Sequence, residues 1–169
     1  LSQQIDQTVA IALWGNMGPA IVRVIEGSQP LHVNMRAGSV MSLFGTATGR
    51  AFAAVLPARV VKEMLAGTQG GARRADRSAV KDAGRELEAI VAEFRRHGVA
   101  RAVGRPIPGV NAFSAPAFDH EGKPAVVLTA LGHEDNFPAG WDSPLATAVR
   151  DAAAEVSHRL GHKDKPLPA

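Results

Sequence analysis

The sequence predicts an α+β domain in which amphipathic helices cover a mostly antiparallel sheet. Short loops join pairs of segments rich in β-branched or alternating apolar residues, which is typical of hairpins. The longer helical segments each carry one apolar stripe, and such a stripe must be buried against a second layer. A chain of 169 residues with 46% hydrophobic residues is sufficient for one domain with its own core.

The first third of the chain is expected to form strands and then to turn into a helix. Strand patterns cover residues 8–14, 20–26 and, more weakly, 31–35. The segment 43–56, LFGTATGRAFAAVL, then reads as a turn that enters a helix. Thr46 is a suitable N-cap, and Pro57 marks the end of this helix.

Helical patterns dominate the middle of the chain. A short helix is expected over residues 59–65, and the glycines of residues 67–72 predict a mobile loop. Apolar residues at helical spacing then predict a long helix that is capped by Ser78 and ends at Gly98.

The last part of the chain returns to strands before a closing helix. Strands are expected over residues 99–103, 110–118 and 124–131. Together with the earlier segments, they predict a sheet of roughly six strands. Ser143 caps the final helix, Pro144 opens it and Gly161 ends it. Residues 1–162 are expected to form the domain, and residues 163–169 a flexible tail.

Composition narrows the possible sites and locations. The chain has no cysteine, which excludes disulfides and cysteine-ligated metals and is compatible with the cytoplasmic location that we expect. No apolar run is long enough to span a membrane, so no membrane partner is expected. The net charge is only +3, and the basic residues of segment 73–85 alternate with acidic ones, which indicates a solvated helix rather than a nucleic-acid surface. The chain begins without Met or a signal peptide, so the natural N-terminus is expected to be missing.

No motif for catalysis or metal binding is found, and we expect no enzyme, no cofactor and no metal site. The Gly-x-Ser-x-Gly elbow is absent, and residues 45–50 lack the spacing of a phosphate-binding loop. His158 and His162 have metal spacing, but Gly161 lies between them at the expected helix end. His133 and Asp135 lie in a polar loop that is expected to be exposed without a ligand.

The start of the helix at Thr46 suggests a binding function. The first turn of a helix has unpaired backbone N–H groups and a partial positive charge, which suit a small carboxylate. The small residues Ala47 to Gly49 allow a ligand to approach this turn. They would equally allow the helix to pack tightly on the sheet, and the residues alone leave both interpretations open.

Several segments together resemble one family. Residues 44–57, FGTATGRAFAAVLP, resemble the H-x-(S/T)-A-x-G-K-A-x-L-A-x-L-P segment of the IclR family of bacterial transcriptional regulators. Residues 109–119, GVNAFSAPAFD, are similar to its G-V-x-C/S-I-A-A-P-V-F-D segment. Further likenesses, in the same order as in the family, lie at residues 6–9, 96–99, 123–132 and 145–161.

The resemblance implies the C-terminal effector-binding domain of such a regulator. Its fold would be similar to GAF and PAS sensor domains, with an antiparallel sheet of about six strands and helices on both faces. Family members carry a winged helix-turn-helix domain upstream, which this chain lacks, so DNA would be contacted only through that missing domain. They assemble as dimers or dimers of dimers, so a homodimer or homotetramer is expected.

The resemblance also implies a ligand site between the helix start and the sheet, for a small organic or aromatic carboxylate. The backbone amides that would hold the carboxylate are those of Ala47 and Thr48. The apolar wall would consist of Val33, Met41 and Val110. The strand residues that would face the ligand are Ala112, Thr129 and Leu131. Ala102, Ala112 and Leu131 stand where the family often has polar groups. Because buried polar ligand groups would go unpaired, we expect a larger, more apolar acid, such as an aromatic one. Arg101 and Arg105 could clamp a carboxylate or be plain surface residues.

Three functions therefore remain to be compared. A sensing domain should have an apolar cavity with helix amides at one end. A pure oligomerisation module should have a filled core at the same place. An enzyme should have a cleft in which His133 converges with Asp135.

Overall fold

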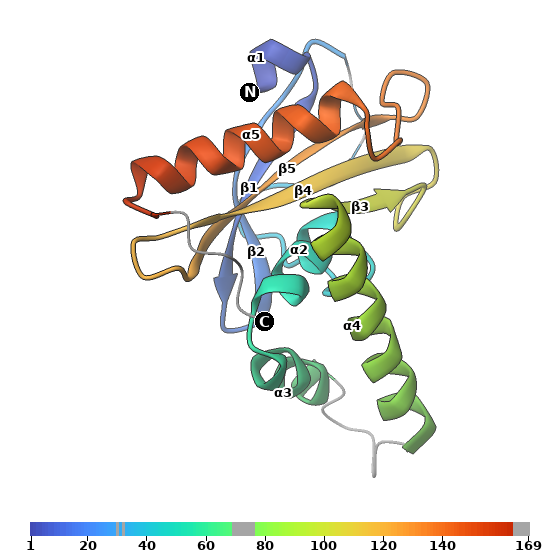
Figure 1. Ribbon diagram of the computed structural model, residues 1–169. Helices are drawn as coiled ribbons and strands as arrows, with labels where there is room; N and C mark the ends of the chain where they lie inside the picture. Colours follow the sequence, from blue (N-terminus) through green and yellow to red (C-terminus); the bar gives the residue numbers. More distant parts are fainter. Residues whose placement is uncertain (30, 32, 69–76, 164–169) are drawn as a thin grey trace.

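The computed structural model describes residues 1–29, 31, 33–68 and 77–163. Within these ranges, five strands form one sheet in the order β2-β1-β5-β4-β3, and all neighbouring strands are antiparallel (Figure 1). The strands are β1 Thr8–Gly15, β2 Gly18–Ile25, β3 Ala100–Val103, β4 Val110–Phe118 and β5 Pro124–His133. The helices are α1 Ser2–Ile5, α2 Ala47–Val55, α3 Ala58–Thr68, α4 Arg77–His97 and α5 Pro144–Arg159. None of the helices described is long and apolar enough to cross a membrane.

The predicted α+β class is confirmed, but the strand expected over residues 31–35 is wrong, so the sheet of the described residues has five strands rather than six. Pro30 and His32 lie outside the described residues. The Val33 and Met35 amides donate to carbonyls only two residues back, which is incompatible with an extended strand. The free edge of β2 instead bonds to the segment 38–41, through a single bridge between Ala20 and Val40.

Most other boundaries lie within a few residues of those predicted. α3 extends to Thr68, so the mobile loop expected over residues 67–72 begins inside a helix and otherwise lies outside the described residues. The expected tail 163–169 also lies outside them, except for Lys163. α4 begins at Arg77, one residue before the predicted cap Ser78.

One face of the sheet is covered by α5, which lies across it in Figure 1. Strand alternation turns Phe113 of β4 and Ala130 of β5 toward this face, where they are buried with Val149 of α5. Phe137, in the loop between β5 and α5, is buried in the same core. The start of α5 follows the prediction, because the Ser143 side chain accepts a hydrogen bond from the Ala146 amide and Pro144 occupies the first turn.

The opposite face is covered by α2 and α4, so helices lie on both faces as predicted (Figure 1). Phe52 of α2, Phe94 of α4 and Val127 of β5 form its core. α2 covers only part of this face, because it begins at Ala47 over β4 and β5 and then runs toward α3. The part of the sheet beyond its first turn is therefore free to border a cavity.

The first turn of α2 packs closely on the preceding loop. A Cβ atom at Gly49 would lie 2.6 Å from the Leu43 Cα and closer still to the carbonyl oxygens of Ser42 and Leu43. Backbone atoms cannot move aside at such distances without shifting the helix start. Glycine at this position is thus required by packing, which places the α2 amides at a fixed distance from the loop.

We expect Gly49→Ala to lower the free energy of unfolding by about 2 kcal/mol, because the added methyl group overpacks against backbone. Gly84→Ala in α4 is a matched control, because an added Cβ there would meet nothing within 4 Å beyond its chain neighbours and the backbone of its own helix. At this second site alanine should stabilise by about 0.5–1 kcal/mol through helix propensity. Urea denaturation of the two variants measures both values, and equal effects of the same sign would contradict the packing argument.

Candidate functional site

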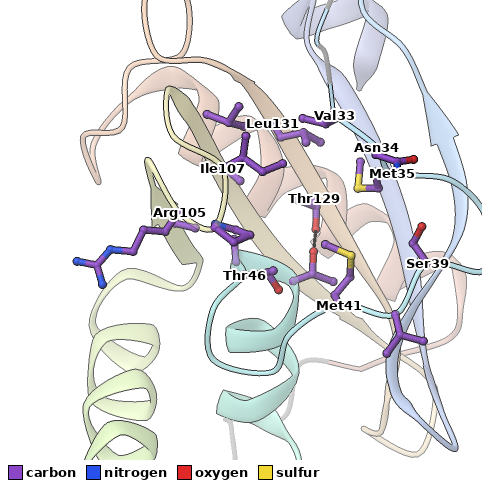
Figure 2. Close-up of a pocket in the computed structure, with 17 residues that line it drawn as sticks. Val33, Asn34, Met35, Ser39, Met41, Thr46, Arg105, Ile107, Thr129 and Leu131 are labelled. Carbon is purple, nitrogen blue, oxygen red and sulfur yellow. Dashed lines mark hydrogen bonds between the residues drawn. The ribbon is translucent and has the colours of Figure 1, made fainter.

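A cavity of about 350 Å³ lies between the start of α2, strands β4 and β5, and two loops (Figure 2). Its volume is within the range of ligand pockets, about 300–1,000 Å³. The lining residues come from the segment 33–41, the α2 start, the end of β3, the loop 105–107 and the two strands. They are Val33, Asn34, Met35, Ser39, Val40, Met41, Thr46, Ala47, Thr48, Ala102, Arg105, Pro106, Ile107, Val110, Ala112, Thr129 and Leu131.

All eight residues predicted to bind a ligand line this one cavity. They come from three parts of the fold: Val33 and Met41 from the connecting segment; Ala47 and Thr48 from α2; and Val110, Ala112, Thr129 and Leu131 from the strands. The strand residues meet because the antiparallel register pairs Ala112 with Leu131, and alternate residues share a face. Their position together is a finding, whereas their contact with a ligand stays a prediction.

The start of α2 presents two unpaired donors. Thr46 Oγ1 accepts a hydrogen bond from the Gly49 amide at 3.0 Å and donates to the Ser42 carbonyl at 2.8 Å. The amides of Ala47 and Thr48 have no hydrogen-bond partner among the described residues. Both residues are buried and line the cavity. The cavity therefore has an electropositive end made of backbone.

Three hydroxyl groups form a chain at the sheet side of the cavity. Thr48 Oγ1 lies 2.8 Å from Thr129 Oγ1, a contact drawn as a dashed line in Figure 2. Ser114 Oγ lies 2.7 Å from the same Thr129 oxygen, and all three side chains are buried. Of these three residues, Thr48 and Thr129 line the cavity and Ser114 does not.

Nine lining residues were not among the eight predicted to bind a ligand, although Thr46, Ala102 and Arg105 had been considered for other roles at the site. Ala102 stands where the family often has a polar group, and it lies opposite Ala112 on the same face of the sheet. The others are loop residues or the helix cap: Asn34, Met35, Ser39, Val40, Thr46, Arg105, Pro106 and Ile107. No residue periodicity predicts which loop side chains turn inward.

The two arginines considered as clamps differ in their contacts. The Arg101 guanidinium lies 3.8 Å above the Trp141 ring and donates to the Ala139 carbonyl at 2.7 Å, so it is committed to structure and does not line the cavity. Arg105 lines the mouth, and in Figure 2 its guanidinium points away from the cavity. Its side chain is exposed and forms no ion pair within the described part of the chain.

The histidines that the sequence analysis considered for catalysis or metal binding lie outside the cavity. His133 Nδ1 lies 3.2 Å from Asp135 Oδ2, but both side chains are more than half exposed and neither lines the cavity. His162 contacts the Asp119 carbonyl at 3.1 Å. Within the ranges described, no group of three or more His, Asp or Glu residues is placed to hold a metal ion.

Known proteins share this fold and much of this sequence pattern. Residues 1–158 match the family described as "Bacterial transcriptional regulator IclR C-terminal". The HTH-type transcriptional regulator KipR of Bacillus subtilis (strain 168) is 23% identical over 162 residues, which make up 96% of this chain and 64% of KipR.

Solved structures agree with this match. The crystal structure of Pseudomonas aeruginosa HmgR is 33% identical, with a TM-score of 0.81 over 96% of this chain and 63% of HmgR. The Thermotoga maritima IclR structure is 24% identical, with a TM-score of 0.75 over 94% of this chain and 63% of that protein. The chain thus spans less than two thirds of the length of these relatives.

The matched family and KipR are both described as transcriptional regulators rather than as enzymes, as expected from the sequence. Because the family match extends over residues 1–158, the chain belongs to the IclR family of bacterial transcriptional regulators and corresponds to the C-terminal domain of that family.

Proposed function

We propose that this domain binds a small organic acid, preferably an aromatic one, in the cavity at the start of α2. The observation that carries the proposal is the pair of unpaired Ala47 and Thr48 amides at one end of a cavity of about 350 Å³. Hydrogen bonds to a charged group contribute about 1.5–3 kcal/mol, so two such donors favour a carboxylate. The helix dipole adds to this preference.

The remaining walls favour an apolar body on the acid. Side chains of Met35, Met41, Ile107, Val110 and Leu131 surround the space beyond the amides. No described side chain that lines the cavity is acidic, and only Thr129 and Thr48 supply polar atoms at the sheet side. A keto acid with two or three carbons would fill little of this space and would leave its second polar group poorly paired.

The bound acid would couple to DNA binding through the segments that it joins. One ligand would contact the α2 start, the strands β4 and β5, and the loops 33–41 and 105–107. A ligand shifts a conformational equilibrium only as far as it binds one state more tightly than the other. The two loops can give this difference in affinity, because their positions determine which contacts the ligand makes. We propose that residues 1–162 act as the effector domain of a longer homodimeric or homotetrameric regulator, with DNA contacted by an upstream helix-turn-helix domain.

An oligomerisation module without a ligand is the alternative. It requires a filled core where the cavity lies, and the open space between Ala47, Ala112 and Thr129 argues against it. A binding function uses this space and also accounts for the unpaired amides.

Isothermal titration calorimetry should show that benzoate binds at least tenfold more tightly than pyruvate or glyoxylate. The reason is that benzoate buries an apolar ring, which contributes about 25 cal/mol per Å² of buried surface, and leaves no second polar group unpaired. Tighter binding of pyruvate or glyoxylate would refute the aromatic preference. Absence of binding by all three acids would favour the oligomerisation module.

Ala47→Pro should weaken benzoate binding by about tenfold or more, because it removes one amide donor to a charged group. Proline is tolerated at the first position of a helix, and α5 already begins with Pro144 after its cap. Thr46 has the extended backbone, with φ −119° and ψ 152°, that a following proline requires.

Benzyl alcohol is the control ligand for this variant, because it has the same ring without the carboxylate. Its affinity should change much less than that of benzoate in the same titrations. An equal loss for both ligands would mean that the proline ring blocks the cavity, and an unchanged benzoate affinity would exclude the Ala47 amide from the site.

A further inference from the structure

A groove of about 460 Å³ lies beside the α2 cavity, between the β1–β2 turn, the loop before α2, and α3. We call it the hairpin groove. Among the described residues that line it none is charged, and Ser42 alone has a polar side chain, whose Oγ accepts a hydrogen bond from the Gly45 amide at 3.1 Å. The groove therefore suits an uncharged, apolar group. Its lining residues are Met17, Gly18, Pro19, Val40, Met41, Ser42, Leu43, Phe44, Met64 and Leu65.

The hairpin groove leaves apolar side chains in contact with water. Met17 is 71% exposed and Val40 is 53% exposed, so both could lose much apolar surface to a bound group. A Cβ atom at Gly18 would lie 3.7 Å from Met64 Sδ, so the turn and α3 are in contact at the groove. Since burial of apolar surface is favourable, an apolar group that covered these side chains would gain affinity.

The hairpin groove and the α2 cavity share part of their walls. Val40 and Met41 line both spaces. The backbone of this shared wall is fixed on β2, because the Met41 amide donates to the Pro19 carbonyl at 2.8 Å and the Ile21 amide donates to the Ser39 carbonyl at 2.9 Å. Methionine is unbranched and adapts its shape to irregular spaces. Rotation of the Met41 side chain would thus join the two spaces without breaking a backbone hydrogen bond.

The shared wall lies close to the proposed carboxylate position. Thr46 Oγ1 donates to the Ser42 carbonyl at 2.8 Å, so the residue that follows Met41 is held against the first turn of α2. An acid bound to the Ala47 and Thr48 amides therefore has Met41 within reach of its apolar body.

We propose that the hairpin groove is a subsite for an apolar tail of the effector. The effector class would then be an aromatic acid that carries an alkyl chain of several carbons. Its carboxylate binds the α2 amides, its ring lies in the cavity, and its tail passes Met41 into the groove. This inference rests on the proposed function, because it presumes that an acid occupies the cavity.

The first measurement compares benzoate with 4-butylbenzoate by calorimetry. Each buried methylene group tightens binding by up to about fourfold, so 4-butylbenzoate should bind at least about tenfold more tightly than benzoate. The α2 cavity could itself bury part of the tail, so variants of the groove are needed to locate it.

Met17→Asp places a charge at the groove, on a side chain that lines the groove but not the cavity. Because an apolar tail would desolvate this charge, 4-butylbenzoate affinity should fall about fivefold or more while benzoate affinity changes by less than about twofold. Met17→Lys should give the same loss, whereas an effect on the distant carboxylate charge would reverse its sign between the two variants.

Asn16 provides the matched control. It is the exposed neighbour of Met17 in the same turn and does not line the groove. Asn16→Asp and Asn16→Lys should therefore leave the ratio of 4-butylbenzoate to benzoate affinity unchanged.

A second copy of the chain is the competing occupant of the groove. Sedimentation of Met17→Asp should show the oligomeric state of the wild-type chain. A smaller oligomer would mean that the groove is covered by another copy, and the tail subsite would be refuted.

The outcomes distinguish this inference from the proposed function. If wild-type chain binds benzoate and Ala47→Pro weakens that binding, but the butyl tail adds no affinity, the subsite is refuted and the acid site stands. The same holds if the butyl tail adds affinity that both Met17 variants retain in full. If wild-type chain binds no acid, both proposals fail.

Discussion

The attachment of the first turn of α2 to the loop before it is the constraint on which the site depends. Gly49 leaves no room for a side chain against the Ser42 and Leu43 backbone, and Thr46 bonds to both the Gly49 amide and the Ser42 carbonyl. These contacts fix the helix start over β4 and β5 and satisfy one of its amides. The next two amides, at Ala47 and Thr48, have no hydrogen-bond partner among the described residues, and both residues line the cavity.

This arrangement divides one face of the sheet into two environments. Under the body of α2, Phe52 and Val127 form a dry core with Phe94. Beyond the first turn, the side chains of Ala102 and Ala112 extend only a short distance from the sheet. The cavity occupies the space that larger side chains would fill. The hydroxyls of Thr48, Ser114 and Thr129 pair with one another on this face of the sheet, so none of these buried polar atoms lacks a partner among the described residues.

The sequence was sufficient for the regular part of this arrangement. The helix cap at Thr46 and the alternation along β4 and β5 are local signals, and the family resemblance related them to a common site. The segment 31–35 was wrongly predicted to be a strand because its apolar residues alternate as in a strand. The free edge of β2 pairs instead with residues 38–41. The loop residues Met35 and Ile107 were not identified, since which side chain of a loop turns inward depends on tertiary packing rather than on periodicity.

The central claim is that the Ala47 and Thr48 amides receive the carboxylate of an acid that lies in the α2 cavity. The most direct measurement is a crystal structure of the chain with benzoate. The account predicts the carboxylate within about 3 Å of both amide nitrogens, with the ring between Met41 and Val110. A benzoate bound elsewhere, or one whose ring faces the α2 start while its carboxylate faces the mouth at Arg105, would contradict it.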